Sequence, residues 1–419
     1  MKIPLYLITN DFPYGDGEGS FILPELPYLM DKFEITIIST SLSPQRTEQV
    51  NADIKVIHYT REASIMRKLL DALCYFGEKD AYQELAEIIK TKTNRLGKLM
   101  ESVLFYEEAR RFRRFLKKEN IIDGTQTGVV YCYWYTFYCY TVLKLFAGNS
   151  KLKIITRTHR YDLYDEGSRF GRQMFKRQMD RNLDAVVFIA EHGREYYLEK
   201  YQIDKKMRDK YVLFRLGVQP VLNPELLIVK DKKEFLLVSC SLIIPRKRVQ
   251  LIVDGLSLID DFQVRWIHFG DGIDFEKLKA YAYEKLNDKS NIYYEFKGTC
   301  KTDEIMQFYT HNEVDAFITT TQSEGCPVSV QEAMACGIPV IGTAVAEIPY
   351  MIRENGILLV ENPNGEEIAN AIRRMHNLSY DEKMSMRNKS YDLWNKEFNA
   401  ANNASRFTEF LYGLTQKCY

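Results

Sequence analysis

The sequence has no excess of charge of either sign. Its 57 Lys and Arg residues balance 57 Asp and Glu residues, which gives a formal net charge of +0. Because a protein whose main partner is nucleic acid usually carries a basic excess, this balance argues against such a partner. Internal repeats and low-complexity tracts are also lacking. A length of 419 residues predicts two domains, each long enough to bury its own core.

Paired cysteines and long apolar runs are lacking too. The 8 cysteines form no Cys-x-x-Cys pair and are scattered, which argues against a disulfide framework or zinc site and indicates free thiols in a reducing compartment. The apolar run at the N-terminus is too short for a signal peptide, so we expect a cytoplasmic protein. Tyrosines, threonines and Lys144 interrupt the apolar stretch Val129–Ala147, which favours a strand and a buried helix over a membrane span.

Short β-branched apolar runs alternate with helical segments along the chain. Such alternation predicts parallel sheets covered on both faces. Two series of similar length predict an α/β protein of two doubly wound domains. The predicted strands are Ile3–Ile8, Ile35–Ser39, Ile54–His58, Val129–Tyr133, Ile154–Arg157, Ala185–Ile189, Tyr211–Phe214, Phe235–Ser239, Val264–Phe269, Ile292–Phe296, Ala316–Thr320, Pro339–Gly342 and Ile357–Val360.

The two series are separated near Gly217–Lys233. Pro220 and Pro224 disfavour a helix there, and Lys230–Lys233 is a solvated charged run. We therefore expect one domain over residues 1–217, a second over residues 233–395, and a C-terminal helix over residues 396–419 that packs back on the first domain. Ligands of such sheets lie beyond the carboxyl ends of the strands, so the expected site is the cleft between the two sheets.

An additional helical insertion is predicted over about residues 61–119. Its second part, Leu96–Lys118, interleaves apolar side chains with cations. Two interpretations remain open: a surface that contacts anionic lipid headgroups, or the solvated face of an ordinary amphipathic helix. The cations are Arg110, Arg111, Arg113, Arg114, Lys117 and Lys118.

The most informative segment begins at Ser323. It follows a predicted strand and opens a helix near Val328, so Glu324 lies in the loop at the strand's carboxyl end. Free amides at the helix start, at Val328 and Ser329, can hold a phosphate or a sugar hydroxyl. Glu332, in the first or second turn, can accept two hydrogen bonds from the vicinal hydroxyls of a ribose.

Structural alternatives compete with these roles. Ser329 and Glu332 have the spacing of a capping box, so Glu332 could simply cap the helix. Glu324 could be a solvated loop acid. Gly325, which has no side chain, permits close approach of the backbone to a ligand.

The same segment resembles the signature of retaining GT-B glycosyltransferases of glycosyltransferase family 4. The resemblance rests on two glutamates separated by seven residues and on the run EAMACGIPV that begins at Glu332. It implies two facing Rossmann-like domains, with a nucleotide sugar bound mainly by the second. It also implies that Glu324 contacts the donor sugar and that Glu332 holds the nucleotide ribose.

Two segments of the first half extend the resemblance. The glycine-rich turn Asn10–Phe21 is similar to the family's N-terminal loop near the donor diphosphate, with Gly17 as the best-placed glycine; alone it could be a plain tight turn. His159, at a strand's carboxyl end, matches a histidine that faces the donor sugar in sugar-polymer members. Asp162 is a second-rank candidate beside it.

A basic loop in the second half also matches, although not completely. The family usually has an Arg shortly after the first strand of this domain and a Lys after a Pro. Lys247 matches the Lys, whereas Ser241 or Leu242 stands near the expected Arg. Arg246 or Arg248 could substitute. Cations here can neutralise a diphosphate leaving group, and a basic surface loop is the alternative.

Two further strand ends, Trp266–Gly272 and Phe296–Thr299, look like those of the family. Gly298 lies where family members receive the base. The first half is rich in tyrosine and arginine, including Tyr133, Tyr135, Arg169 and Arg172. Aromatic faces suit sugar stacking and arginines suit a lipid pyrophosphate; core packing and solvated charge are the alternative.

Together these resemblances imply a hexosyltransferase. It would move a sugar from a UDP-sugar or GDP-sugar, with retention of the anomeric configuration, to a glycan or polyprenyl-pyrophosphate-linked acceptor. This transfer would serve polysaccharide biosynthesis. If the protein contacts lipid, it would do so at the inner face of the membrane. No Asp-x-Asp motif is placed to hold a metal ion, and no cofactor besides the donor substrate is expected. The rivals are a sugar-nucleotide epimerase of the same fold, a nicotinamide-dependent oxidoreductase, and a non-catalytic sugar-nucleotide-binding subunit.

Overall fold

The computed structural model describes residues 2–15, 17–61, 63–219 and 233–416. Asp16 and most of the segment on which the sequence predicts the domain break, residues 220–232 with Pro220, Pro224 and Lys230–Lys232, lie outside these residues. The chain divides into two compact units. Unit 1 runs up to Arg215 and includes residues 403–416, and unit 2 is Leu216–Asn402.

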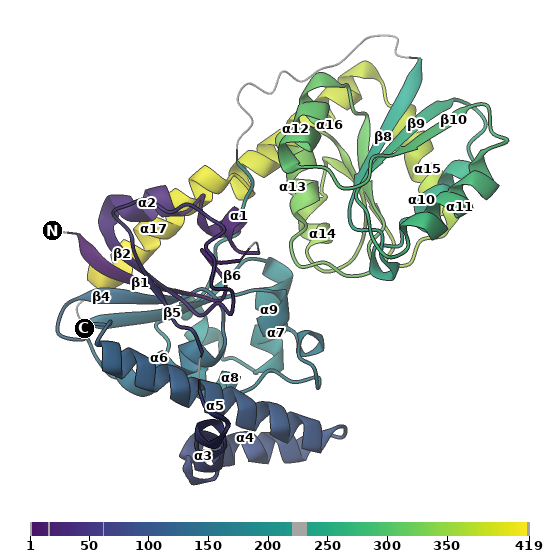
Figure 1. Cartoon of the computed structure of the whole chain (residues 1–419). Helices are drawn as coiled ribbons and strands as arrows, with labels where there is room; N and C mark the ends of the chain where they lie inside the picture. Colours follow the sequence, from purple (N-terminus) through teal and green to yellow (C-terminus); the bar gives the residue numbers. More distant parts are fainter. Residues whose placement is uncertain (1, 16, 62, 220–232, 417–419) are drawn as a thin grey trace. The chain divides into compact units, whose positions relative to one another are not determined.

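Unit 1 is built on a seven-stranded parallel sheet of order β3-β2-β1-β4-β5-β6-β7 (Figure 1). The strands are β1 (Ile3–Thr9), β2 (Phe33–Ser39), β3 (Lys55–His58), β4 (Gly128–Cys132), β5 (Leu152–Thr158), β6 (Ala185–Phe188) and β7 (Tyr211–Leu213). The helices outside the insertion are α1 (Gly19–Ile22), α2 (Leu26–Lys32), α6 (Phe137–Phe146), α7 (Arg160–Leu163), η2 (Asp165–Gly167), α8 (Lys176–Asp180), α9 (Glu191–Lys200), η3 (Lys205–Lys210) and α17 (Ala400–Gln416).

Helices cover both faces of this sheet. Ile8 and Val130 point to the face packed by α5, α6, α8 and α9, whereas their neighbours Leu7 and Val129 point to the face packed by α1, α2 and α17. Because successive residues of a strand point to opposite faces, a sheet buried on both sides needs apolar residues at every position. That requirement explains the nearly continuous apolar runs in the sequence.

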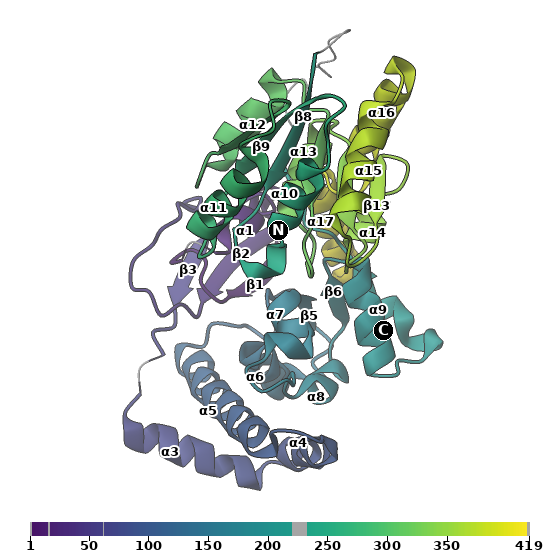
Figure 2. The same cartoon turned by 90° about the vertical axis from the view of Figure 1, so that its right-hand side faces the viewer.

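The insertion forms α3 (Ile65–Leu73), η1 (Cys74–Gly77), α4 (Lys79–Lys90) and α5 (Arg95–Glu119). Both views place α3 and α4 beyond α5, on its side away from the sheet (Figures 1 and 2). Three cations of α5 are held in ion pairs: Arg110 and Arg114 bind Asp71, and Arg111 binds Glu107. The charges of these three arginines are therefore balanced within the insertion.

Unit 2 contains a six-stranded parallel sheet of order β10-β9-β8-β11-β12-β13. Its strands are β8 (Glu234–Cys240), β9 (Gln263–Phe269), β10 (Ile292–Phe296), β11 (Ala316–Thr319), β12 (Val340–Thr343) and β13 (Gly356–Leu359). One face is packed by α10 (Gln250–Ser257), α11 (Phe275–Leu286) and α15 (Gly365–His376), the other by α12 (Thr302–His311), α13 (Val328–Ala335), α14 (Ile348–Met351) and α16 (Tyr380–Glu397).

Each predicted strand is present, with ends displaced by two residues at most. The apolar stretch after Val129 forms β4 and the buried helix α6, as predicted. No helix within the described residues is long and apolar enough to span a bilayer. The two doubly wound parallel sheets confirm the predicted α/β fold class.

The last helix, α17, packs on unit 1. Its Phe407 and Leu411 are buried against the sheet. The ring of Phe407 lies 4.4 Å from the guanidinium of Arg157, a fully buried side chain of β5. Arg157 pairs with Glu25 of the segment before α2 at 2.6 Å, so the charge is neutralised inside the core. Helix α17 thus shields the ion pair of Arg157 and Glu25 from solvent.

Candidate functional site

The strand order of unit 2 reverses between β8 and β11, which are neighbours in the sheet. Ligands of open α/β sheets bind at such a switch point, outside the carboxyl ends of the strands. The loops that leave these two strands contact each other: the Gln322 N–H donates to the Arg246 carbonyl at 2.8 Å, and the Thr320 hydroxyl donates to the Arg248 carbonyl at 3.0 Å. The short helix η4 (Pro245–Lys247) lies in the first loop.

Three predicted site residues meet at this point. The ammonium of Lys247 forms an ion pair with the carboxylate of Glu324. The guanidinium of Arg246 lies 3.7 Å from the same carboxylate and also donates to the carbonyl of Ser323. Two cations face one carboxylate, so the cluster keeps a positive excess that suits an anionic group such as a diphosphate.

Arg248 has a different role from Arg246. Its guanidinium donates to the carbonyls of Thr320, Thr321 and Glu361, at 2.9, 3.0 and 2.8 Å, and to the side chain of Asn362. The backbone of Arg248 is left-handed, with φ +50°, which directs the chain out of η4. Arg248 therefore ties the loops after β11 and β13 together, and its donors are occupied within the protein.

Helix α13 begins at Val328, as the sequence predicts, and Glu332 lies in its second turn. Its N-cap is Pro327, which offers no side-chain cap, and Ser329 lies inside the helix. The capping-box alternative for Glu332 is therefore wrong. Because the first amides of a helix lack intrahelical acceptors, the N-terminus of α13 presents N–H groups beside the cation cluster.

Glu332 is nearly buried, and no other described residue donates a hydrogen bond to its carboxylate in the structure. Burial raises the pKa of Glu332 to about 7. A buried carboxylate without a donor is costly to keep charged. Such a group is poised to accept hydrogen bonds from a bound hydroxyl-bearing ligand.

The loops after β9 and β10 are held together by two glycines. The N–H of Gly270 donates to the carbonyl of Gly298 at 2.8 Å. Gly270 has φ +133°, and a Cβ there would lie 1.9 Å from the carbonyl oxygen of Ser241, so no other residue fits. Gly298 has φ +67°, a conformation that favours glycine, and there is open space at its Cβ position.

In unit 1, the loop after β1 is organised by Glu18. Its carboxylate accepts the N–H groups of Asn10, Asp11 and Phe12, at 3.1, 2.8 and 2.6 Å, and the indole N–H of Trp134 after β4. Burial raises the pKa of Glu18, which these hydrogen bonds oppose. Gly17 is exposed, with open space at its Cβ position, so the fold itself places no demand for glycine there.

His159 follows β5 and is buried between aromatic rings. Its ring centroid lies 4.2 Å from that of Trp134 and 5.0 Å from that of Tyr133. Neither ring nitrogen has a hydrogen-bond partner among the described residues. Burial, and then the charge of Arg157, hold the pKa of His159 well below its usual value, so the ring is neutral at physiological pH.

Asp162 has a structural environment. Its carboxylate accepts the N–H groups of Tyr135 at 2.7 Å and His159 at 2.6 Å. Burial raises the pKa of Asp162 and lowers the pKa of its neighbour Lys176. Asp162 therefore fixes the backbone on which His159 and Tyr135 sit.

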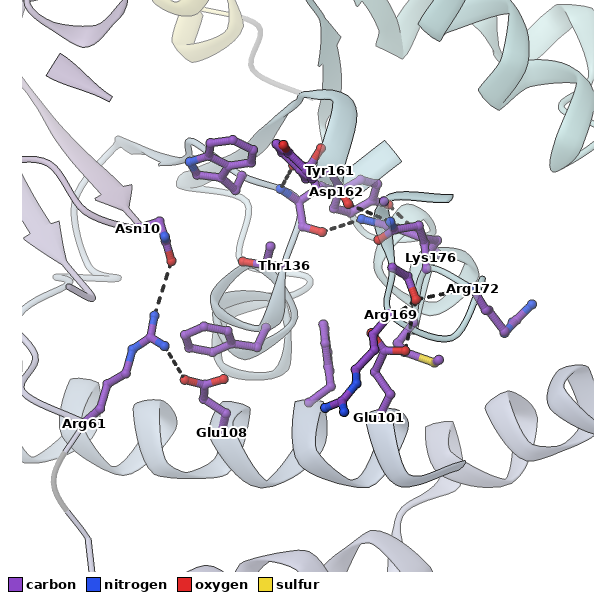
Figure 3. A pocket seen from close by; sticks show the side chains of 18 residues that line it. Asn10, Arg61, Glu101, Glu108, Thr136, Tyr161, Asp162, Arg169, Arg172 and Lys176 are labelled. Carbon is purple, nitrogen blue, oxygen red and sulfur yellow. Dashed lines mark hydrogen bonds and ion pairs between the residues drawn. The ribbon is translucent and has the colours of Figure 1, made fainter. Parts of the chain in front are cut away.

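A cavity of about 520 Å³ opens beside these residues in unit 1 (Figure 3). Helix α5, the start of α6 and the segment after α7 form its walls. Arg61 reaches across one end, 2.8 Å from Glu108 and 3.3 Å from the side chain of Asn10. Of the predicted acceptor-side residues, Arg169, Arg172 and Tyr135 line the cavity, whereas Tyr133 is core. Other lining residues include Glu101, Phe105, Trp134, Phe137, Tyr161 and Lys176.

The sequence of unit 2 is similar to those of known proteins. Residues 227–392 match the family model of glycosyl transferases group 1. An uncharacterized glycosyltransferase of Methanocaldococcus jannaschii is 27% identical over 197 residues, 46% of this chain and 50% of that protein, so the match spans half of the relative's length.

Solved structures agree over the whole length. The lipopolysaccharide outer core galactosyltransferase WaaB superimposes with a TM-score of 0.64 and 17% identity, covering 97% of this chain and 100% of WaaB. Anabaena HepE in complex with UDP gives a TM-score of 0.61 and 14% identity, covering 99% of this chain and 100% of HepE. The chain has the GT-B fold. The match of residues 227–392 to glycosyl transferases group 1 is what points to a glycosyltransferase.

Within the GT-B fold, the structure brings together Lys247, Arg246 and Glu324, and it places Glu332, Val328 and Ser329 on the adjoining helix. Among the described residues, no cluster of His, Cys, Asp and Glu could hold a metal ion. Sequence reasoning missed Glu18, whose signal was an acid inside a glycine-rich turn. It also missed Trp134, an aromatic residue directly after a buried strand.

Proposed function

We propose that this protein is a retaining glycosyltransferase of family 4 that transfers a hexose from a UDP-sugar or GDP-sugar to a glycan or lipid-linked glycan, without a metal ion, in surface-polysaccharide synthesis. The observation that carries the proposal is the cluster of Lys247, Arg246 and Glu324 at the switch point of unit 2. The match of unit 2 to glycosyl transferases group 1 supports it.

The chemistry of sugar transfer fits these residues. A nucleotide sugar loses its diphosphate as negative charge grows on the β-phosphate, and preorganised cations stabilise that charge. Lys247 and Arg246 supply the cations, and the first amides of α13 supply N–H donors. Glu332 accepts the ribose hydroxyls, and Glu324 hydrogen-bonds the sugar once the diphosphate draws Lys247 toward itself.

The family arginine that is missing near Ser241 has one replacement in this proposal. Arg246 lies beside Glu324 in the cluster, whereas the donors of Arg248 are occupied by three carbonyls and Asn362. We therefore assign the second cationic role to Arg246. Lys247 remains the first.

The cavity of unit 1 is the proposed acceptor site. It combines aromatic rings of Trp134 and Tyr161 with the charged groups of Arg169 and Glu101. Aromatic faces stack on sugar rings, and carboxylates and guanidinium groups hydrogen-bond their hydroxyls. Lipopolysaccharide is the product class named for WaaB, and UDP is bound by HepE, which supports a glycan acceptor and a UDP-sugar donor.

A panel of nucleotide sugars tests the proposal. The true donor should raise the melting temperature, because a ligand at 100 times its Kd stabilises by about 2.7 kcal/mol. Transfer from that donor is then measured for Lys247→Ala and Glu324→Gln, with loss of tenfold or more expected, about 1.4 kcal/mol of barrier. Lys389→Ala and Glu354→Gln are matched controls, since this exposed pair, 2.6 Å apart, lies elsewhere in unit 2.

The product distinguishes the rivals. Transfer with a retained anomeric configuration, read by NMR, supports the proposal. A free epimerised sugar formed without an acceptor indicates the epimerase. Stabilisation by a donor with no turnover on any acceptor indicates a non-catalytic subunit, and stabilisation by NAD(H) alone indicates an oxidoreductase.

A further inference from the structure

Helix α3 of the insertion turns its apolar side outward. Ile65, Met66, Leu69, Leu70 and Leu73 are each between 51% and 79% exposed. At about 100° per residue these positions form one stripe along the helix. Phe76, which follows in η1, is also more than half exposed.

The polar side of α3 faces the protein instead. Asp71 is 3% exposed and binds two arginines of α5, with Arg110 Nε at 3.2 Å and Arg114 Nη1 at 2.5 Å. The Tyr75 hydroxyl hydrogen-bonds Ser102 of α5 at 2.9 Å. Because Asp71 lies on the opposite side of the helix from the stripe, these contacts hold the apolar side away from the protein.

The exposed apolar surface is concentrated in the insertion. Helix α5 carries a second stripe at Leu96, Met100 and Leu104, each more than half exposed. The insertion holds half of the large apolar side chains that are exposed among the described residues. Single exposed apolar residues are ordinary, but contiguous ones mark a surface that another body covers.

The charges on α3 indicate what kind of partner covers the apolar stripe. Arg67 and Lys68 are exposed and lie at the two borders of the apolar stripe, while the helix's single acid, Asp71, is buried in its ion pairs. An apolar stripe bordered by cations suits an anionic bilayer, where lysine and arginine reach headgroups as the apolar face enters the acyl boundary. If the α3 helices of two copies packed against each other, their cations would face cations, because this helix has no exposed acid to pair with them.

We propose that the outward face of α3, formed by Ile65, Met66, Leu69, Leu70, Leu73 and Phe76, docks the protein on the surface of an anionic lipid bilayer. The docking does not depend on the proposed activity. It would bring α5, which supplies Glu101, Phe105 and Glu108 to the cavity of unit 1, close to the headgroups. A lipid-linked acceptor could then reach that cavity without leaving the membrane.

Co-sedimentation with vesicles tests the proposal. The full chain should bind vesicles of phosphatidylglycerol and phosphatidylcholine at least tenfold more tightly than vesicles of phosphatidylcholine alone. Leu69→Glu with Leu73→Glu should lower binding at least tenfold, and Arg67→Glu with Lys68→Glu should remove the preference for anionic lipid. Leu258→Glu with Ile273→Glu, at two exposed apolar positions of unit 2, is the matched control and should bind as the wild type does.

Melting temperatures confirm that each variant is folded, as expected for substitutions at exposed positions. The proposal is overturned if the wild type binds neither type of vesicle, or if the α3 double variant binds as well as the control. A wild-type dimer in gel filtration that this variant converts to a monomer, without vesicle binding by either, would assign the face to a second copy and also overturn it.

Discussion

The indole N–H of Trp134 and three backbone N–H groups converge on one carboxylate, that of Glu18. Trp134 follows β4 and Glu18 belongs to the loop after β1, and these strands are neighbours at the switch point of unit 1. The contact therefore fixes the two loops that approach His159, whose ring lies against Trp134.

Glu18→Gln should loosen this arrangement. The amide keeps one acceptor oxygen for four donors, so we expect a loss of about 1.5–3 kcal/mol in the free energy of unfolding. Transfer should fall at least tenfold, while donor affinity should change little because the proposed donor site lies in unit 2. Unfolding followed by tryptophan fluorescence measures the loss of stability, and steady-state kinetics measure transfer and the dependence on donor. Glu34→Gln, at an exposed position of β2, is the control. Unchanged kcat in Glu18→Gln would contradict a positioning role.

Alanine substitution should affect stability at Arg248 and transfer at Arg246. Arg248→Ala removes hydrogen bonds to three carbonyls, so we expect unfolding to become easier by about 2 kcal/mol. Arg246→Ala should leave stability within about 1 kcal/mol and lower transfer at least tenfold. Chemical denaturation and kinetics on both variants decide the assignment. A catalytic loss confined to Arg248→Ala would reverse it.

Glu332→Gln should stabilise the protein in a pH-dependent way. Burial raises the pKa of Glu332 to about 7 from 4.5, so the folded state holds this proton more tightly than the unfolded state. The penalty of the buried charge is therefore absent below the unfolded pKa, grows as the pH rises between the two pKa values, and is complete above the folded pKa. We expect a gain of about 3 kcal/mol at pH 8 and less than about 1 kcal/mol at pH 5.

Nucleotide binding separates stability from function at the same residue. Glu332→Gln should weaken binding of the donor, because a neutral amide accepts ribose hydroxyls less well than a carboxylate. Thermal melts at both pH values and calorimetric titration with the donor give the two readouts. Equal melting temperatures for wild type and variant at pH 8 would show that burying the charged carboxylate of Glu332 does not destabilise the protein.

Phe407→Ala should destabilise unit 1 although it lies near the C-terminus. The ring is buried against Tyr131 and Arg157, and its loss creates a cavity and exposes a buried charge. We expect about 3–5 kcal/mol of destabilisation. Phe410→Ala, on the same helix at a partly exposed position, should cost much less. Differential scanning calorimetry compares the two.

The sequence predicted the strands well because both faces of each sheet are buried, which leaves an uninterrupted apolar run for each strand. It also predicted that Lys247 and Glu324 share an edge, since parallel strands end on the same side. It could not distinguish Arg246 from Arg248, because the difference lies in which carbonyls a flexible side chain reaches. Likewise, the spacing of Leu69 and Leu73 marks an apolar stripe, but only the pairing of Asp71 shows that the stripe faces outward.

The placement of α17 on unit 1 has a consequence for biosynthesis. Residues 2–215 are translated before unit 2, yet α17, which shares one face of their sheet with α1 and α2, is translated after it. Until then, Tyr131 and Arg157 lack the ring that shields them. The core of unit 1 is therefore completed only after unit 2 has been synthesised, and a ribosome stalled near residue 400 would leave these two side chains without the ring of Phe407.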